Sequence, residues 1–140
     1  MKAKGLLFFL AMVILGSCDE KRLAPEEIKP VVGKWMLNAV KQAGDAKQWE
    51  PIASKDGYVM EIRYDGVILD ANGLPACCVP SYLVYQGKKF TIEPKEKLAP
   101  NPSCALVLCL ACDTWYLELE NDQLILNQCN SGGRNRYARL

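Results

Sequence analysis

Seven cysteines give this chain its clearest chemistry, and all except Cys18 lie in its second half. Cys109 and Cys112 have the C-x-x-C spacing of redox dithiols and of thiolate zinc sites. A redox motif begins a helix, which lowers the pKa of its first thiol. The two cysteines stand instead in an apolar run with the pattern of a strand and no adjacent basic residue. We therefore expect neither a redox site nor a metal site.

A disulfide framework is the interpretation that we favour, because an even number of cysteines in an exported domain is typical of structural bridges. A bridge between the adjacent Cys77 and Cys78 would close a strained ring, so each is expected to bond elsewhere. Each bridge is expected to contribute about 2 to 4 kcal/mol of stability. The expected pairing joins Cys77 and Cys78 to Cys104 and Cys109, and Cys112 to Cys129.

The composition argues against several classes of function. The chain has no histidine, which excludes Ser-His and Cys-His nucleophile pairs and mixed Cys/His zinc sites. Glu61, Asp65 and Asp70 lie near one predicted hairpin, but their spacing defines no catalytic pair. No phosphate-binding loop or dinucleotide fingerprint is present. We expect no enzymatic activity, no cofactor and, because acidic and basic residues nearly balance, no nucleic-acid partner.

The first residues have the pattern of an export signal. Lys2 and Lys4 precede an apolar stretch, residues 6–15, that is too short to span a bilayer and ends at Gly16-Ser17-Cys18. This arrangement resembles a bacterial lipoprotein signal, although an ordinary secretory signal is the alternative. The resemblance implies that residues 1–17 are removed and that Cys18 is lipidated, which anchors the protein to a membrane.

The residues after Cys18 bear on location and domain boundaries. Asp19-Glu20 resembles the export signal of surface lipoproteins, although an aspartate there resembles an inner-membrane retention signal in enteric bacteria. We expect a cell-envelope protein, with the outer membrane or the cell surface favoured over the inner membrane. Residues 18–30 are polar and are predicted to form the lipidated cysteine and a flexible tether. Residues 31–140 are long enough for one domain.

The pattern of the domain is that of short antiparallel strands. Residues 58–64 alternate strictly and are followed by Asp65-Gly66, which predicts a tight hairpin turn into residues 67–70. A second hairpin is predicted from residues 82–85 to residues 89–93, with Phe90 facing inward. A third runs through Trp115 and Leu117, turns at residues 121–122 and returns through residues 124–126.

Further strands are predicted at residues 35–41, at the apolar stretch 104–112 and at residues 134–139. The total is eight or nine strands, and consecutive hairpins favour a closed arrangement. We therefore predict an all-β protein, an antiparallel up-and-down β-barrel with disulfides.

A family resemblance supports this fold. Gly33-Lys34-Trp35, which follows a short turn, resembles the Gly-x-Trp start of lipocalins and related calycin barrels. The resemblance implies that a basic residue in the last strand, Arg136 or Arg139, packs across Trp35 and closes the base of the barrel. The chain is shorter than the larger lipocalins, so it is most similar to compact lipocalin-like domains of bacterial lipoproteins.

Two functions follow from this architecture. The first is binding of a small apolar ligand inside the barrel. The alternative is a filled barrel whose outer surface binds a protein. An outward tyrosine pair, Tyr85 and Tyr116, favours the alternative, and Ser131 to Tyr137 resembles the Ser-Gly-x-x-Tyr loop of lipoproteins that inhibit lysozyme, with the tyrosine two positions late. The predicted ligand-binding residues are Tyr58, Met60, Ile62, Tyr64, Phe90, Trp115 and Leu117.

Overall fold

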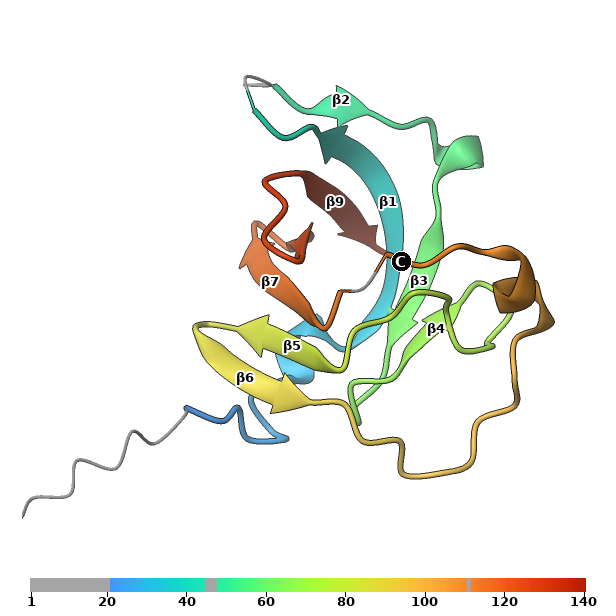
Figure 1. The fold of residues 1–140 in the computed structure, drawn as a ribbon. Helices are drawn as coiled ribbons and strands as arrows, with labels where there is room; N and C mark the ends of the chain where they lie inside the picture. Colours follow the sequence, from blue (N-terminus) through green and yellow to red (C-terminus); the bar gives the residue numbers. More distant parts are fainter. Residues whose placement is uncertain (1–20, 45–47, 111) are drawn as a thin grey trace, which may run out of the picture.

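The computed structural model describes residues 21–44, 48–110 and 112–140, so the predicted signal peptide and Cys18 lie outside the described residues. Within these ranges one mixed sheet of nine strands curls into a half-barrel (Figure 1). The strands are β1 Gly33–Lys41, β2 Glu50–Pro51, β3 Val59–Ile62, β4 Ile68–Asp70, β5 Tyr82–Tyr85, β6 Lys88–Thr91, β7 Thr114–Glu120, β8 Gln123–Gln128 and β9 Arg134–Arg139. Three short 3-10 helices accompany them, η1 Lys29–Val31, η2 Ser54–Asp56 and η3 Pro102–Leu106.

The sheet is open, so the predicted closed antiparallel barrel is wrong, although the β class and the disulfides are confirmed. The strand order is β4-β3-β1-β9-β8-β7-β5-β6, with β2 paired to β1, which leaves β4, β6 and the short β2 as edge strands. Strand β5 lies between β6 and β7 and pairs with β7 in parallel. The cause is the connection from β6 to β7, residues 92–113, which is too long for a hairpin and lets the chain cross over.

The predicted strand at residues 104–112 does not form. Residues up to Leu106 belong to η3, and the described residues that follow carry no regular structure. Pro100 and Pro102 remove backbone donors just before this stretch, and disulfides from Cys104 and Cys109 hold it against residues 77–78 instead of against a sheet edge. The apolar residues of this stretch therefore belong to an exposed loop and not to a strand.

The hairpin turns follow local sequence. Residues 86–87 and residues 121–122 all have positive φ, as the turn that fits two twisted antiparallel strands requires. The turn between β3 and β4 is one residue longer than predicted, because the Arg63 amide donates to the Val67 carbonyl at 2.9 Å. Gly66 closes this turn at φ +79°, and a Cβ there would stand 2.8 Å from the Phe90 ring.

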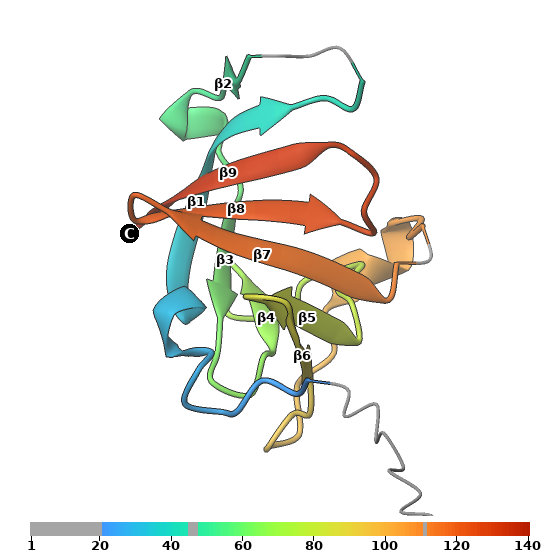
Figure 2. The same ribbon diagram turned by 90° about the vertical axis from the view of Figure 1, so that its left-hand side faces the viewer.

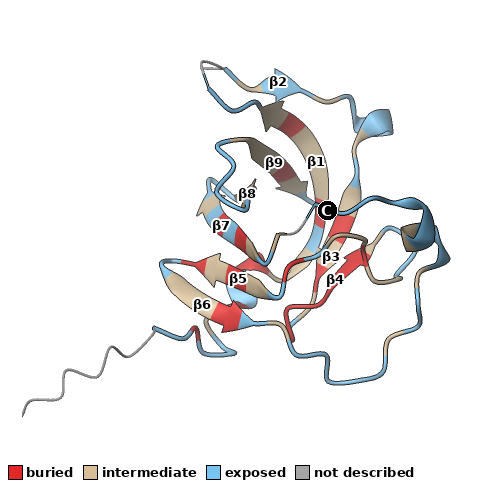
Figure 3. Ribbon diagram, viewed as in Figure 1, coloured by how far each residue is buried: buried red, intermediate tan, exposed pale blue. Residues whose placement is uncertain are grey.

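The core lies on the concave face of the sheet (Figure 3). Of the residues predicted to face inward, Met60, Ile62, Phe90, Trp115 and Leu117 are buried. The expected inward position of Tyr64 is wrong, because β3 ends at Ile62 and the alternation does not extend beyond the strand, whereas Tyr58 directly precedes β3 and is half-exposed. The exposed fractions are 45% for Tyr58 and 57% for Tyr64.

One tyrosine was expected to point outward and does not. Tyr85 is 5% exposed and belongs to the core, because it shares the inner face of β5 with Leu83. Tyr116 lies on the outer face of β7 and is 39% exposed. The outward tyrosine pair is therefore absent.

The folded part begins before residue 31, where the sequence predicted the tether to end. Leu23 and Ile28 are buried in the core. The Leu23 amide donates to the Lys89 carbonyl at 2.8 Å, and the Lys89 amide donates to the Lys21 carbonyl at 2.9 Å. This segment therefore pairs with the free edge of β6 and covers part of it, which is how open sheets avoid association through their edges. No helix within the described ranges has the length and apolar character needed to cross a membrane.

Candidate functional site: an apolar pocket beside a disulfide-clamped loop

The concave face of the half-barrel is filled at one end and hollow at the other. The filled end packs around Trp35, which is fully buried. The Arg139 guanidinium lies 4.1 Å from the centre of the Trp35 ring and donates to the Val32 carbonyl at 3.0 Å and to the Pro30 carbonyl at 2.6 Å. Of the two basic residues predicted to cover Trp35, Arg139 therefore makes the contact, whereas Arg136 lies over Trp49 at 4.9 Å.

Gly33 begins β1 directly before this contact. Its φ of +133° lies in a region that other residues rarely adopt, and a Cβ there would stand 3.0 Å from the Arg139 guanidinium. The glycine therefore lets the arginine reach Trp35. Of the four residues predicted to close the barrel, Gly33, Trp35 and Arg139 lie together at the filled end, whereas Arg136 contacts Trp49 instead.

The hollow end holds a pocket of about 680 Å³. It lies where β7 begins and β8 ends, at the right-hand end of the half-barrel in Figure 2, whereas the C terminus lies at the opposite end. Aliphatic and aromatic side chains form most of its wall, half of them from β1, β3, β7 and β9 and half from connecting segments, together with cysteines of the disulfides. The apolar and aromatic lining residues are Leu37, Tyr58, Met60, Ala76, Leu108, Leu110, Trp115 and Tyr137.

The polar groups of the pocket are uncharged. Gln128, Ser131 and Asn135 contribute amides and a hydroxyl, and the described lining residues include no carboxylate, amine or guanidinium. Burial raises the pKa of Tyr137 to about 12, against a smaller lowering by its hydrogen bond with Asn135. Burial also raises the pKa of Tyr58, with a smaller contribution from Asp70. Both phenols are therefore neutral at physiological pH and can only donate or accept hydrogen bonds.

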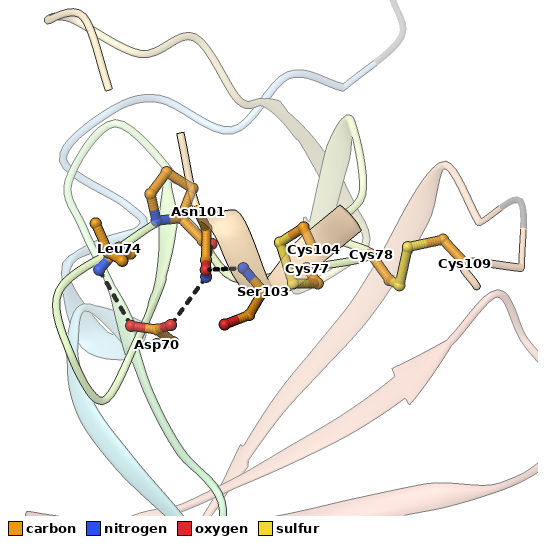
Figure 4. The surroundings of a disulfide bond; sticks show 9 residues. Asp70, Leu74, Cys77, Cys78, Asn101, Ser103, Cys104 and Cys109 are labelled. Atoms are coloured by element: carbon orange, nitrogen blue, oxygen red, sulfur yellow. Dashed lines mark hydrogen bonds between the residues drawn. A yellow bond between two sulfur atoms is a disulfide. The ribbon is translucent and has the colours of Figure 1, made fainter. Parts of the chain in front are cut away.

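One wall of the pocket is a loop that two disulfides hold in place. We call residues 101–110 the cysteine loop. Cys104 bonds to Cys77 and Cys109 bonds to Cys78 (Figure 4). These bridges tie the loop at two points to adjacent residues of the β4–β5 connection, so the loop cannot pivot about a single bond. A third bridge joins Cys112 to Cys129, at the start of β7 and just beyond β8.

This pairing is the one chosen from the sequence, and it also resolves which cysteine of each pair meets which. Because Cys109 and Cys112 bond to different partners, their C-x-x-C spacing does not form a dithiol.

Asn101 fixes the start of the cysteine loop. Its side-chain nitrogen donates to the Asp70 carboxylate and to the Pro75 carbonyl, both at 2.9 Å. Its side-chain oxygen accepts from the Ser103 amide at 3.1 Å, and the Asp70 carboxylate also accepts from the Leu74 amide at 3.1 Å (Figure 4). The loop therefore has a polar anchor at one end in addition to its two bridges.

The structure brings together only part of the predicted ligand site. Tyr58, Met60 and Trp115 line the pocket, whereas Ile62 and Leu117 lie among the core residues and are not part of its lining. Tyr64 and Phe90 line a separate hollow of about 480 Å³ near the edge strand β6.

Two groups of lining residues were missed. Asn135 and Gln128 stand two positions from the buried Tyr137 and Leu126 and share their face of the sheet, so the period of two along a strand could have found them once that face was assigned. Leu108 and Leu110 were missed because their segment was interpreted as a strand. No local signal in the sequence shows that these leucines stand at a pocket mouth.

Comparisons with protein-family models, with curated proteins and with solved structures find no match to this chain.

Proposed function

We propose that this protein is a lipid-anchored protein of the cell envelope whose lipocalin-like half-barrel binds a small apolar molecule in the pocket beside the cysteine loop. The observation that carries the proposal is the pocket itself. Its volume of about 680 Å³ lies within the range of small-molecule sites, and such sites combine apolar walls with a few polar groups as this one does. The contact of Arg139 with Trp35 supports the lipocalin-like assignment.

The lining selects the chemistry of the ligand. Tyr58, Trp115 and Tyr137 offer aromatic surface, whereas Gln128 and Asn135 offer hydrogen bonds. An ionised group in this pocket would lose its hydration without gaining a countercharge, which costs several kcal/mol. The ligand is therefore an apolar molecule with at most one neutral polar end.

The envelope location rests on two features of the chain. Cys18 stands in the sequence context of a lipoprotein signal. Three disulfides among the described residues suit a protein that folds outside the cytoplasm. As proposed above, the anchor holds the domain at a membrane surface, with the outer membrane or the cell surface favoured.

Ligand binding is favoured over the protein-binding alternative by the position of Tyr137. The resemblance to lysozyme-inhibiting lipoproteins requires this tyrosine and Ser131 to meet a partner. Tyr137 is 4% exposed and lines the pocket, so it is available to a small ligand and not to a protein surface, whereas Ser131 lines the same pocket but is exposed. We propose binding without catalysis, because the pocket wall offers no pair of titratable groups that could transfer a proton at neutral pH.

Native mass spectrometry tests the proposal. Residues 18–140 with Cys18→Ser are exported to a bacterial periplasm and purified without detergent, which keeps every described residue and lets the disulfides form. We expect a second mass of a few hundred daltons that leaves on denaturation. Leu37→Trp should exclude it by filling the pocket, whereas Tyr116→Trp on the outer face should retain it. A bare mass that also fails to bind added fluorescent fatty acid would refute ligand binding.

A further inference from the structure

The cysteine loop exposes more apolar surface than any other segment that the structure describes. The exposed fractions are 91% for Leu106, 93% for Leu108 and 85% for Leu110. The intervening residues differ, because Val107 is 47% exposed and Cys109 is held by its bridge to Cys78. The three leucines are thus presented to solvent at every second position, from the end of η3 through the irregular residues that follow, and Figure 3 shows this stretch as exposed.

This exposure is enforced by the covalent structure. A free apolar loop of this kind would fold back and bury its leucines, because each buried leucine contributes about 1.5 to 3 kcal/mol. The bridges from Cys104 and Cys109, together with the side chain of Asn101, hold the loop at the mouth of the pocket instead. An apolar tip kept in solvent by two disulfides indicates a surface that meets an apolar partner.

The composition of the tip suits a lipid bilayer. The chain carries no charged residue from Leu98 to Cys112, so insertion of the tip would desolvate no ion. Leu108 and Leu110 also line the pocket, so a molecule leaving the bilayer at the tip would enter the pocket directly.

We propose that the tip of the cysteine loop, Leu106 to Leu110, inserts shallowly into the lipid bilayer and turns the mouth of the pocket toward it. The orientation follows from Leu108 and Leu110, which line the pocket, and its use for ligand entry rests on the proposed function, whereas the contact itself does not depend on the ligand. A second copy of the chain is a poorer occupant, because three leucines and a valine cover less than the ~800 Å² per partner of a stable protein interface.

Vesicle flotation tests this contact on residues 18–140 with Cys18→Ser, so that no acyl chain contributes. The probe is vesicles of neutral phosphatidylcholine, which exclude electrostatic attraction. We expect the protein to float with the vesicles, and the triple change Leu106→Ser, Leu108→Ser and Leu110→Ser to weaken partitioning about hundredfold. Leu140→Ser is the matched control, since that leucine is 63% exposed at the opposite end and should change nothing.

A second measurement reports directly on depth. Leu108→Trp should show fluorescence that brominated acyl chains quench, whereas Leu140→Trp should not. Absence of vesicle binding by the unsubstituted tip, or equal loss with Leu140→Ser, would overturn the proposal. So would a dimer in lipid-free sedimentation that the triple change dissociates, because the tip would then bind a second copy.

Leu106 separates this inference from the proposed function, because its side chain is not part of the pocket wall. Leu106→Ser should weaken vesicle binding about fivefold and leave the co-purifying mass unchanged. If the unsubstituted protein carries the ligand but does not bind vesicles, the bilayer contact is refuted and the proposed function stands. If it binds vesicles but carries no ligand, the proposed function is refuted and the bilayer contact stands.

Discussion

Removing Cys77–Cys104 and Cys78–Cys109, the two parallel bridges, should lower the free energy of unfolding non-additively. Either bridge alone already restricts most of the denatured chain that the other restricts. Cys77–Cys104 closes a chain separation of 27 residues and Cys78–Cys109 one of 31 residues. In the chain-entropy treatment, either bridge alone removes about 3.5 kcal/mol of denatured-state entropy. With the first bridge in place, the second closes only a ring of about six residues, one step from Cys77 to Cys78 and five from Cys104 to Cys109.

The magnitude follows from that small ring. Closing about six residues is worth only about 2 kcal/mol in the same treatment. Replacing either bridge by an alanine pair should therefore cost about 2 kcal/mol. Replacing both should cost about 5.5 kcal/mol, which exceeds the sum of the two single effects by about 1.5 kcal/mol.

Urea unfolding under non-reducing conditions measures these costs. The variants are Cys77→Ala with Cys104→Ala, Cys78→Ala with Cys109→Ala, and all four changes together. The third bridge is the control, because its loop of 17 residues is not shortened by the other two, so its removal should cost about 3 kcal/mol in any background. Strictly additive costs for the two parallel bridges would refute the shared-loop reasoning.

Three further predictions concern single side chains. In a urea titration, Arg139→Gln should lower the free energy of unfolding by about 2 kcal/mol, because it removes the contact with Trp35 and two hydrogen bonds to backbone carbonyls. Arg136→Gln is the control and should cost less than half as much. Gly66→Ala should lower the thermal midpoint at a cost of about 2 kcal/mol, since φ is +79° and the added Cβ meets a ring; an unchanged midpoint would contradict the strained turn. Because the folded pKa of Tyr137 is raised to about 12, its stabilisation is fully present below about pH 10 and is lost toward pH 12, by about 2 to 3 kcal/mol. Tyr137→Phe should remove this dependence of the free energy of unfolding on pH between about 10 and 12. An unchanged pH dependence would show that a different group causes it.

Local pattern was sufficient for those strands whose partners are close in sequence. The alternation around Trp115 and the turn at residues 121–122 predicted β7, β8 and their hairpin, because a two-residue turn with positive φ fixes the register of its strands. The last strand also begins where its glycine turn ends. Tyr64 was misplaced because alternation carries no information on where pairing stops, and that limit depends on partners elsewhere in the chain.

Sheet closure could not be predicted from local pattern, because it depends on the path of the long connection before β7. A short turn there would have placed β7 beside β6 as in a consecutive meander. The connection instead crosses to place β7 beside β5, and nothing local distinguishes the two outcomes. The exposure of the leucines in the cysteine loop could not be predicted from local pattern either. Their apolar pattern is typical of a strand, and only the bridges to Cys77 and Cys78 explain why they remain outside the core.

The open sheet and the cysteine loop are therefore two consequences of one crossover. A closed barrel would complete its wall with strand pairing, which satisfies backbone groups and fills the gap between edges. Here part of the wall beside the pocket is a loop without strand pairing, and disulfides supply the rigidity that hydrogen bonds would otherwise give. The stability of the loop and the shape of the pocket mouth should consequently change together. A variant that lacks both parallel bridges should lose ligand and vesicle binding even at urea concentrations far below its unfolding transition, because the leucines are then free to collapse into the pocket that they line.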